Sequence, residues 1–322
     1  MGVLYPLRFQ PILRRYLWGG RRLESLGKQL GPEGDYAESW EIVDRGADQS
    51  VVAAGPLAGG TLGALMREFG RPLLGRHAAH ERFPLLFKFL DAQHRLSLQV
   101  HPDDARAAAL DPPDLGKSEA WVILEAQPRS YIYAGLRRGI DRDTLGHEIA
   151  RRTVELCCER IEPRAGDCYF LPAGVVHALG PGLLVAEIQQ AADTTYRLYD
   201  YDRVGPDGQP RKLHVAEALE AIDYDYGPVA AQPPQPTDVP GVERLVACDP
   251  FVLDRWTLSA PHRTRGDDRC HILVVLEGAI EVAGDPVGQP LTRGGLILLP
   301  AELGALDVQV RDSAVVLDAY LP

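Results

Sequence analysis

A proline-rich stretch at positions 228–240, PVAAQPPQPTDVP, constrains the fold more than any other feature of the sequence. It carries five prolines in thirteen residues. Proline lacks the N–H group that helices and sheet ladders use, so this stretch favours an extended linker over a strand or a helix. We therefore divide the chain into three parts: residues 1–227, the linker at 228–240, and residues 241–322.

The C-terminal part alternates short apolar runs with turns. FVLDRWTLSA, CHILVVLEGAIEVAGD and SAVVLDAYL are rich in β-branched residues, and glycines and prolines separate such runs. This pattern is typical of a small all-β domain. The run that contains His271 shows no cluster of metal-binding side chains, since His271 stands alone in it. We therefore expect this part to be structural.

The first part mixes strand and helix patterns. Apolar spacing predicts helices in TLGALMREFG, in DRDTLGHEIARRTVELCCER and in HVAEALEAI. The helix predicted near 141–160 falls between two groups of strands, which suggests an insertion into a β domain. Strands are predicted for LSLQVH, EAWVILEA, DCYFLPAG and LLVAEIQQ.

Composition narrows the classes of function. The 322 residues include 34 Lys and Arg against 45 Asp and Glu, a net charge of −11, which argues against coating nucleic acid or an anionic membrane. No run reaches the roughly 18 apolar residues of a membrane span, and the N-terminus lacks the pattern of a secretory signal. Five cysteines without a C-x-x-C pair predict free thiols. These features predict a cytoplasmic protein.

Four side chains from three predicted strands have the chemistry of metal ligands. Gln99 and His101 project to one face, because side chains alternate along a strand. Glu119 stands at the entrance of an apolar strand, where an unpaired carboxylate is costly. Lys117 alternates onto the same face, so an ion pair is an alternative role for this carboxylate. His177 follows a turn in the run GDCYFLPAGVVH.

Such a donor set suits Zn²⁺, with Gln99 as an unusual fourth ligand. One carboxylate against a divalent ion leaves a charge of about +1, which favours an anionic intermediate. Two histidines and one carboxylate without the amide would instead indicate Fe(II) and oxygen chemistry. We expect the amide to make that alternative less favourable.

Seven blocks stand out in order along the first part of the chain: YLWGG (16–20), ESWE (38–41), FPLLFKFLDA (83–92), LSLQVHPDD (96–104), GKSEAW (116–121), LPAGVVHALG (171–180) and EIQQAADTTYRLYDYDR (187–203). The G-x5-P-x-G-x2-H spacing that ends at His177 resembles the second motif of the cupin superfamily, without the Asn that often follows. Along residues 5–220, the blocks together resemble type I mannose-6-phosphate isomerases in their short bacterial form.

The resemblance implies a mainly β fold of two cupin domains, which are jelly-roll β-barrels. The first, at 1–227, would hold the metal site and carry helical insertions. The second, at 241–322, would be a small cupin-like domain without a metal site. The long helical domain of eukaryotic members has no room here, because only about 45 residues separate Glu119 from the second motif. Leu179 stands where those members carry a tyrosine.

The resemblance also implies an activity. The family interconverts mannose 6-phosphate and fructose 6-phosphate by moving a proton through a cis-enediol. Arg197 matches the active-site arginine of the family, although an ion pair with Asp193 or Asp200 is an alternative role. Lys117 is a second candidate for proton transfer, because a nearby dication would depress the pKa of its amine. Zinc, one ion per chain, would be bound by Gln99, His101, Glu119 and His177.

Four further residues are expected to contact the sugar phosphate. Ser97 and Lys88 correspond to the end that holds the phosphate, and a hydroxyl and an ammonium suit that group. Glu38 and Asp193 are expected to line the pocket, with surface ion pairs as the alternative. The expected partner is thus a sugar phosphate, with no nucleic acid and no membrane, and the enzyme is expected to be a monomer or a homodimer.

Three other functions stay open at this point. The chain could be a non-catalytic or differently specific metal-binding cupin that binds a sugar. It could be an Fe(II) oxygenase, or a phosphoglucose isomerase of the cupin type. All the expected catalytic groups are present, which favours the zinc-dependent isomerase.

Overall fold

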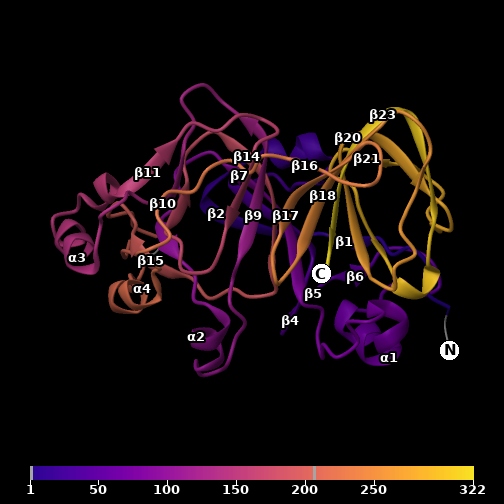
Figure 1. Ribbon diagram of the computed structural model, residues 1–322, viewed down its shortest axis with the longest axis horizontal. Coiled ribbons are helices and arrows are strands. Elements are labelled where there is room, and N and C mark those ends of the chain that lie inside the picture. The colour runs from indigo at the N-terminus through magenta and orange to yellow at the C-terminus, as the bar shows by residue number, and fades with distance from the viewer. Residues whose placement is uncertain (1–2, 206–207) are drawn as a thin grey trace.

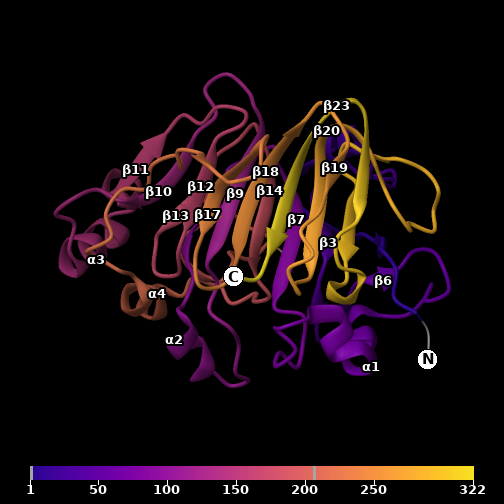
Figure 2. The ribbon, with the colours of Figure 1, turned by 45° about the vertical axis from the view of Figure 1, so that its right-hand side comes forward.

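The computed structural model describes residues 3–205 and 208–322. Strands make up 40% of the chain and helices 14%, which confirms the predicted mainly β class. Figures 1 and 2 show the long strands standing side by side, with the helices α3 (Arg142–Ala150) and α4 (Val215–Ala221) at one end of the molecule and the C-terminal strands at the other.

Six antiparallel strands form the central sheet. Along β7 (Leu85–Ala92), Phe87 and Phe89 belong to one apolar cluster and Leu90 to another, so both faces of this strand are covered. This explains why β7 is an almost continuous apolar run. The strand order is β12 (Cys168–Leu171), β9 (Glu119–Ala126), β14 (Leu183–Gln190), β7 (Leu85–Ala92), β3 (Tyr36–Ile42) and β2 (Ile12–Gly20).

A five-stranded sheet faces the central sheet across a shared core. Trp121 and Val185 of the central sheet pack there with Ile132 and Leu179 of the second sheet. The shared core makes the two sheets a sandwich. The strand order of the second sheet is β11 (Cys158–Ile161), β10 (Ile132–Leu136), β13 (His177–Leu179), β8 (Leu98–Val100) and β15 (Tyr196–Tyr199).

Short helices cover the outer side of the five-stranded sheet. Leu145 of α3 and Ala218 of α4 pack with Leu98 and Val100 on that side. Among the described residues, no helix is long and apolar enough to cross a membrane. The α-helices are α1 (Leu62–Leu74), α2 (Asp104–Ala108), α3 (Arg142–Ala150) and α4 (Val215–Ala221), and the 3-10 helices are η1 (Arg22–Leu26), η2 (Val154–Cys157) and η3 (Ala301–Leu303).

The long helix predicted near 141–160 is wrong in its second half. The helix α3 ends at Ala150, and Arg152 adopts a positive φ of 61° that a right-handed helix cannot contain. The following residues form η2 and then β11, which pairs with β10. Tertiary pairing therefore overrides the local helical spacing.

The C-terminal part forms an eight-stranded antiparallel sheet with its own apolar interior. Trp256, Leu273 and Val316 lie in that interior. The path runs β16 (Gln235–Pro236), β17 (Val242–Ala247), β18 (Val252–Leu258), β23 (Asp307–Tyr320), β20 (His271–Val282) and β21 (Leu291–Thr292), with β19 (His262–Arg263) on β23 and β22 (Leu296–Leu299) on β20. Two small pairs complete the fold: β1 (Phe9–Gln10) with β6 (Val51–Val52), and β4 (Asp44–Arg45) with β5 (Asp48–Gln49).

The outer face of the central sheet packs against this C-terminal sheet. Phe87 and Phe89 of β7 share one buried cluster with Leu253, Ile272 and Leu317. The central sheet is therefore covered by apolar residues from both ends of the chain. This leaves the opposite face of the central sheet to carry the polar groups described below.

The proline-rich segment at 228–240 is extended, but the prediction that it forms no ladder is wrong. Gln235 and Pro236 form β16, which pairs with Arg244 and Glu243 of β17. The strand lies at the edge of its sheet, where a proline without an N–H group is tolerated. Upstream, the Val229 N–H donates to the Ala134 carbonyl, so the segment is also fixed to the first sandwich.

His271 is also less isolated than the sequence suggests. Its Nδ1 lies 2.9 Å from Asp318, 47 residues away, and its Nε2 lies 3.1 Å from Asp267. Burial would lower the pKa of His271, but the two carboxylates raise it to about 10. This imidazolium is thus held between two carboxylates inside the C-terminal part.

The five cysteines are free thiols, as predicted, and all five lie in the described ranges. Four are buried. Burial raises the pKa of the Cys168 thiol to about 12, so that it stays protonated. These cysteines behave as small core residues.

Candidate metal centre and active site

The candidate site lies between the two facing sheets, where their shared core changes from apolar to polar. Along β14, Val185 belongs to the apolar core, whereas the next inward side chain is the buried carboxylate of Glu187. On the five-stranded sheet, Gln99 pairs with His177 on one side and with Arg197 on the other. These three side chains therefore form one row that faces the polar end of the central sheet.

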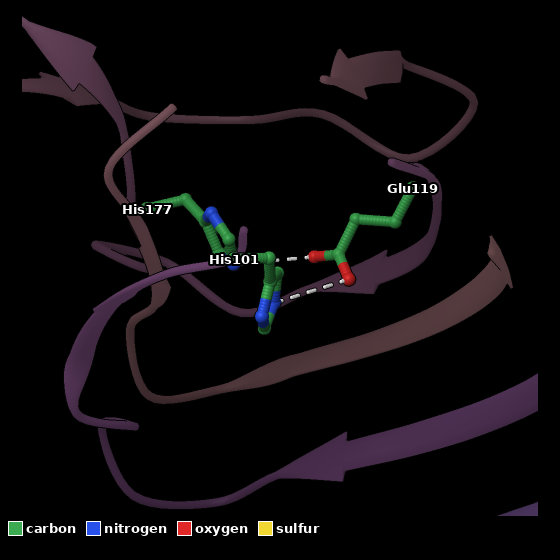
Figure 3. A group of neighbouring side chains, drawn as sticks. All are labelled: His101, Glu119 and His177. Carbon is green, nitrogen blue, oxygen red and sulfur yellow. Dashed lines mark ion pairs between the residues drawn. The ribbon is translucent and has the colours of Figure 1, made fainter. Parts of the chain in front are cut away.

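His101, Glu119 and His177 meet at the centre of this region (Figure 3). One ligand atom from each lies within 4.8 Å of the others, and each side chain is at most 2% exposed. His177 Nε2 is 3.3 Å from Glu119 Oε1, and His101 Nε2 is 3.5 Å from Glu119 Oε2. Three of the four predicted ligands are thus brought together by three different strands or strand ends.

Both imidazoles are oriented by backbone carbonyls. His101 Nδ1 lies 2.9 Å from the Thr194 carbonyl, and His177 Nδ1 lies 2.9 Å from the Val175 carbonyl. A carbonyl only accepts, so each Nδ1 carries the hydrogen and each Nε2 keeps its lone pair. Burial is the main cause that lowers the pKa of both histidines, which keeps them neutral. Neutral imidazoles with Nε2 aimed at a carboxylate are the state that binds a cation.

Gln99 is the fourth predicted ligand, and its amide reaches the same point. Its Nε2 lies 3.3 Å from His177 Nε2. Because rotation of an amide exchanges its oxygen and nitrogen, this side chain can also present its oxygen there.

The residues present fit a metal ion. Glu119 is fully buried, and its Oε2 accepts no hydrogen bond of acceptable angle, although Lys117 Nζ lies nearby. The pKa of Glu119 is held below its ordinary value: burial opposes this shift, and the positive charge of Lys117 is the largest effect that outweighs it. Two imidazole nitrogens and one carboxylate, with an amide beside them, form a donor set suited to a divalent cation.

Lys117 lies beside the metal ligands. Its Nζ is 2.9 Å from Glu119 Oε2 and 3.2 Å from His101 Nε2, and the residue is 5% exposed. The ion pair with Glu119 that the sequence left as an alternative therefore forms, and it forms inside the candidate site. The ion pair and a catalytic role for Lys117 are compatible.

Lys88 is surrounded by carboxylates. Its Nζ lies 3.2 Å from Glu187 Oε1 and 3.7 Å from Glu38 Oε1. Burial would lower the pKa of Lys88, but Glu187 and Glu38 raise it. Glu38 also accepts a hydrogen bond of 2.6 Å from the indole of Trp40. Lys88 and Glu38 thus lie together on the central-sheet wall of the site.

Glu187 belongs to the site but was missed in the sequence. Its Oε2 accepts a hydrogen bond of 2.9 Å from Trp121 Nε1, and its Oε1 faces Lys88 and, at 3.9 Å, Lys117. Burial and the charge of Glu119 raise the pKa of Glu187 to about 7. The same signal that indicated Glu119, a carboxylate in an apolar strand, is present in LLVAEIQQ and would have found it.

Arg197 occupies the opposite wall. Its Nε donates to Ser97 Oγ at 3.3 Å, and its Nη1 donates to the Lys212 carbonyl at 2.9 Å. The predicted alternative partner, Asp200, is instead bonded by Arg203 and by Arg211, at 3.1 and 2.6 Å. Two guanidinium groups, those of Arg203 and Arg211, therefore bond the Asp200 carboxylate, and their charges act on the nearby Arg197.

Asp193 lies at the rim of the site and is exposed. Its charge and that of Glu38 both act on the Tyr16 hydroxyl, although burial is the main cause that raises the pKa of Tyr16. The ring of Tyr16 stacks on Trp18, with centroids 5.6 Å apart. Tyr16, which was not singled out in the sequence, thus forms part of the rim.

This fold and site define a class: an antiparallel β-sandwich protein that buries a His–Glu–His group able to hold a metal ion, beside lysine and arginine side chains. Residues 6–132 match the family described as phosphomannose isomerase type I, catalytic domain. The mannose-6-phosphate isomerase ManA of Bacillus subtilis is 34% identical over 94% of this chain and 96% of its own length. The mannose-6-phosphate isomerase of Streptococcus mutans is 32% identical over 92% of each chain.

Solved structures agree with the sequence matches. The crystal structure of the mannose 6-phosphate isomerase from Bacillus subtilis superposes with a TM-score of 0.90, at 30% identity over 99% of this chain and 100% of that one. A variant of the phosphomannose isomerase from Salmonella typhimurium shares the fold, with a TM-score of 0.78 at 14% identity over 99% and 100% of the two chains. The chain described here therefore belongs to the mannose-6-phosphate isomerase family, a family of isomerase enzymes.

Proposed function

We propose that this protein is a zinc-dependent enzyme that interconverts mannose 6-phosphate and fructose 6-phosphate. The observation that carries the proposal is the buried group of His101, Glu119 and His177, with Lys117 beside it and Arg197 on the facing wall. The family to which the chain belongs supports the same activity.

The metal in this proposal is one zinc ion per chain, held by His101, Glu119, His177 and Gln99. Nitrogen and carboxylate oxygen are ordinary ligands of zinc. When bound, zinc supplies positive charge that polarises the oxygens on C1 and C2 of the sugar.

The proton transfer is assigned to side chains of this chain. In open-chain mannose 6-phosphate the C2–H bond breaks, its proton moves to a base, and the carbonyl oxygen on C1 gains a proton, so that a cis-enediol forms. A proton is then delivered to C1 while the C2 hydroxyl loses its own proton and becomes the ketone of fructose 6-phosphate. Lys117 and Arg197 are the candidates for moving this proton, and Arg197 also supplies fixed positive charge for the enediolate.

The two walls of the site suit opposite ends of the substrate. Ser97 stands beside the Arg197 guanidinium, with Arg203 and Arg211 close by, and this positive charge suits a phosphate. Lys88, which the sequence groups with Ser97 at the phosphate end, lies on the other wall between Glu187 and Glu38. We therefore propose that Lys88 and Glu38 hold sugar hydroxyls and that Asp193 lines the entrance.

The domain organisation is part of the proposal. Residues 1–227 would be a cupin domain with helical insertions that carries catalysis, residues 228–240 a linker, and residues 241–322 a second, cupin-like domain without a metal. The double-layered sheets of the first part and the separate apolar interior of the second support this division. We further propose a cytoplasmic enzyme, a monomer or a homodimer, whose partner is its sugar phosphate.

A coupled assay of mannose 6-phosphate conversion tests the function. The protein is assayed as prepared, after chelation, and after zinc is added back. Turnover that disappears on chelation and returns with zinc is expected. Turnover that is indifferent to chelation would contradict the metal site, and zinc bound at one per chain without turnover would indicate a non-catalytic sugar-binding protein.

A further inference from the structure

The two histidines of the metal centre are oriented in different ways. The carbonyl that holds His177 belongs to Val175, two residues away in the same turn. The carbonyl that holds His101 belongs to Thr194, 93 residues away on the segment that follows β14. The orientation of His101 therefore depends on what fixes Thr194.

A buried carboxylate fixes Thr194. Asp114 Oδ2 accepts a hydrogen bond of 2.8 Å from Thr194 Oγ1 and a longer one of 3.4 Å from the Asp193 N–H. Asp114 is 8% exposed and lies on the loop between α2 and β9. The Asp114 carboxylate contacts none of the proposed metal ligands itself. It holds Thr194, whose carbonyl contacts the proposed ligand His101.

Asp114 is itself held from two sides. Arg45 Nη2 on β4 donates to Asp114 Oδ2 at 2.8 Å, and the Leu115 N–H donates to Asp114 Oδ1 at 2.9 Å. The Asp114 N–H donates to the Ala107 carbonyl of α2. Hydrogen bonds from Thr194 and Leu115 and the charge of Arg45 lower the pKa of Asp114 against the opposing effect of burial. The carboxylate is therefore ionised and fixed near neutral pH.

We propose that Asp114 is a positioning residue for metal binding: by holding Thr194, it aims Nε2 of His101 at the point shared with Glu119 and His177. Partners of this kind outside the ligand set fix the tautomer and ring orientation of a ligating histidine, and their loss typically lowers metal affinity about 10- to 100-fold. This inference rests on the proposed metal site.

The test uses two impaired variants and two controls. Asp114→Asn removes the charge and half of the acceptor capacity. Thr194→Val removes the hydroxyl donor but keeps the backbone carbonyl. Thr194→Ser keeps the hydroxyl and should therefore keep zinc binding close to that of the wild type. Asp111→Asn removes an exposed carboxylate from the same loop as Asp114.

The main readout is the zinc dissociation constant of the full-length protein, measured by competition with a chromophoric chelator. Asp114→Asn and Thr194→Val are expected to weaken zinc binding about 10- to 100-fold, whereas Thr194→Ser and Asp111→Asn stay close to wild type. At saturating zinc, kcat of Thr194→Val should recover, because the ligand is misaimed rather than absent. A merely structural role would lower the unfolding temperature of the zinc-free protein without changing the dissociation constant.

A failure of the inference about Asp114 can be distinguished from a failure of the proposed metal site. If wild type binds zinc, His101→Gln weakens that binding, and both impaired variants bind as tightly as wild type, the inference about Asp114 is overturned while the metal site stands. If His101→Gln leaves zinc binding unchanged, the proposed metal site itself fails. Should Asp114→Asn not fold, Thr194→Val alone decides.

Discussion

The ammonium nitrogen of Lys117 lies 2.9 Å from the carboxylate of Glu119, with only Ser118 between them in the sequence. Both side chains are buried, and the carboxylate belongs to the candidate metal centre. The lysine therefore faces the point that Glu119 shares with His101.

Replacing Lys117 by Met should remove a proton-transfer group without removing a metal ligand. We expect kcat to fall at least about 100-fold, because positioned acids and bases contribute about 10²- to 10⁴-fold. Zinc content, measured by atomic absorption, should stay at one per chain. Loss of zinc together with activity would instead assign Lys117 to metal binding, and an unchanged kcat would remove it from the mechanism.

Arg197→Ala should lower the kcat of isomerisation about 100- to 1,000-fold and leave the zinc content unchanged. The guanidinium supplies fixed charge next to Ser97, and removing one such donor from a preorganised site costs about 100- to 1,000-fold in kcat. The coupled assay and a metal analysis check both statements. Arg151→Ala, at an exposed arginine after α3, is the matched control. Activity comparable to that of the control would exclude a catalytic Arg197.

Glu119→Gln should weaken zinc binding at least about 100-fold, since it replaces the charged ligand of the group. Gln99→Ala should weaken it less, because an uncharged amide is lost. Equilibrium dialysis against zinc measures both changes. A protein that retains zinc fully after Glu119→Gln does not use this site. If Gln99→Ala has no effect on tightly bound zinc, the Fe(II) alternative regains weight.

Lys28→Met should destabilise the fold by about 3–5 kcal/mol, because it leaves a buried carboxylate uncompensated. Lys28 Nζ lies 2.7 Å from Glu41 and donates to the Gly294 carbonyl of the C-terminal part at 2.8 Å. Burial raises the pKa of Glu41 even with the lysine present. Chemical denaturation measures the change.

The control is the double variant Lys28→Met with Glu41→Leu, which removes both charges. It should be less destabilised than Lys28→Met alone, because no unpaired charge remains buried. Equal losses of unfolding free energy in the single and the double variant would show that the hydrogen bond from Lys28 to the Gly294 carbonyl, and not the ion pair with Glu41, stabilises the fold.

The raised pKa of His271 leads us to expect a loss of stability at alkaline pH. Its pKa is raised to about 10 in the fold, above the ordinary value of 6.5, so the folded state binds this proton more tightly than the unfolded state. The resulting stability is complete below about pH 6.5 and is lost as the pH rises through 10. Denaturation curves should therefore show a fall in unfolding free energy between pH 7 and pH 10.

Comparison with variants isolates the histidine from other groups that titrate in this range. The fall in unfolding free energy between pH 7 and pH 10 should be smaller in His271→Gln. It should be unchanged in His94→Gln, which replaces an exposed histidine. If the unfolding free energy depends on pH in the same way in wild type and His271→Gln, the ion pairs of His271 with Asp318 and Asp267 do not cause the loss of stability at alkaline pH.

Much of the site could be predicted from the sequence because its signals are local. Alternation along a strand places Gln99 and His101 on one face, and an unpaired carboxylate at the start of an apolar strand marks Glu119. The linear blocks that resemble mannose-6-phosphate isomerases carry the identity of the family. Short apolar runs between glycines and prolines predicted an all-β C-terminal part, and the resemblance to the family extended a mainly β fold to the whole chain.

Other features depended on tertiary contacts between distant segments. The residues at 151–160 were predicted to continue a helix but form a turn, η2 and then β11, which pairs with β10 more than 20 residues away in the sequence. Pro236 joins a ladder because it lies at the edge of a sheet. The partners of His271 and the carbonyl that holds His101 lie 47 and 93 residues away, so no local pattern could indicate them. The sequence by itself thus determined the types of ligand and the strands that carry them. Only the tertiary structure decided which side chains meet and how they are aimed, because the pairing of distant strands sets those distances.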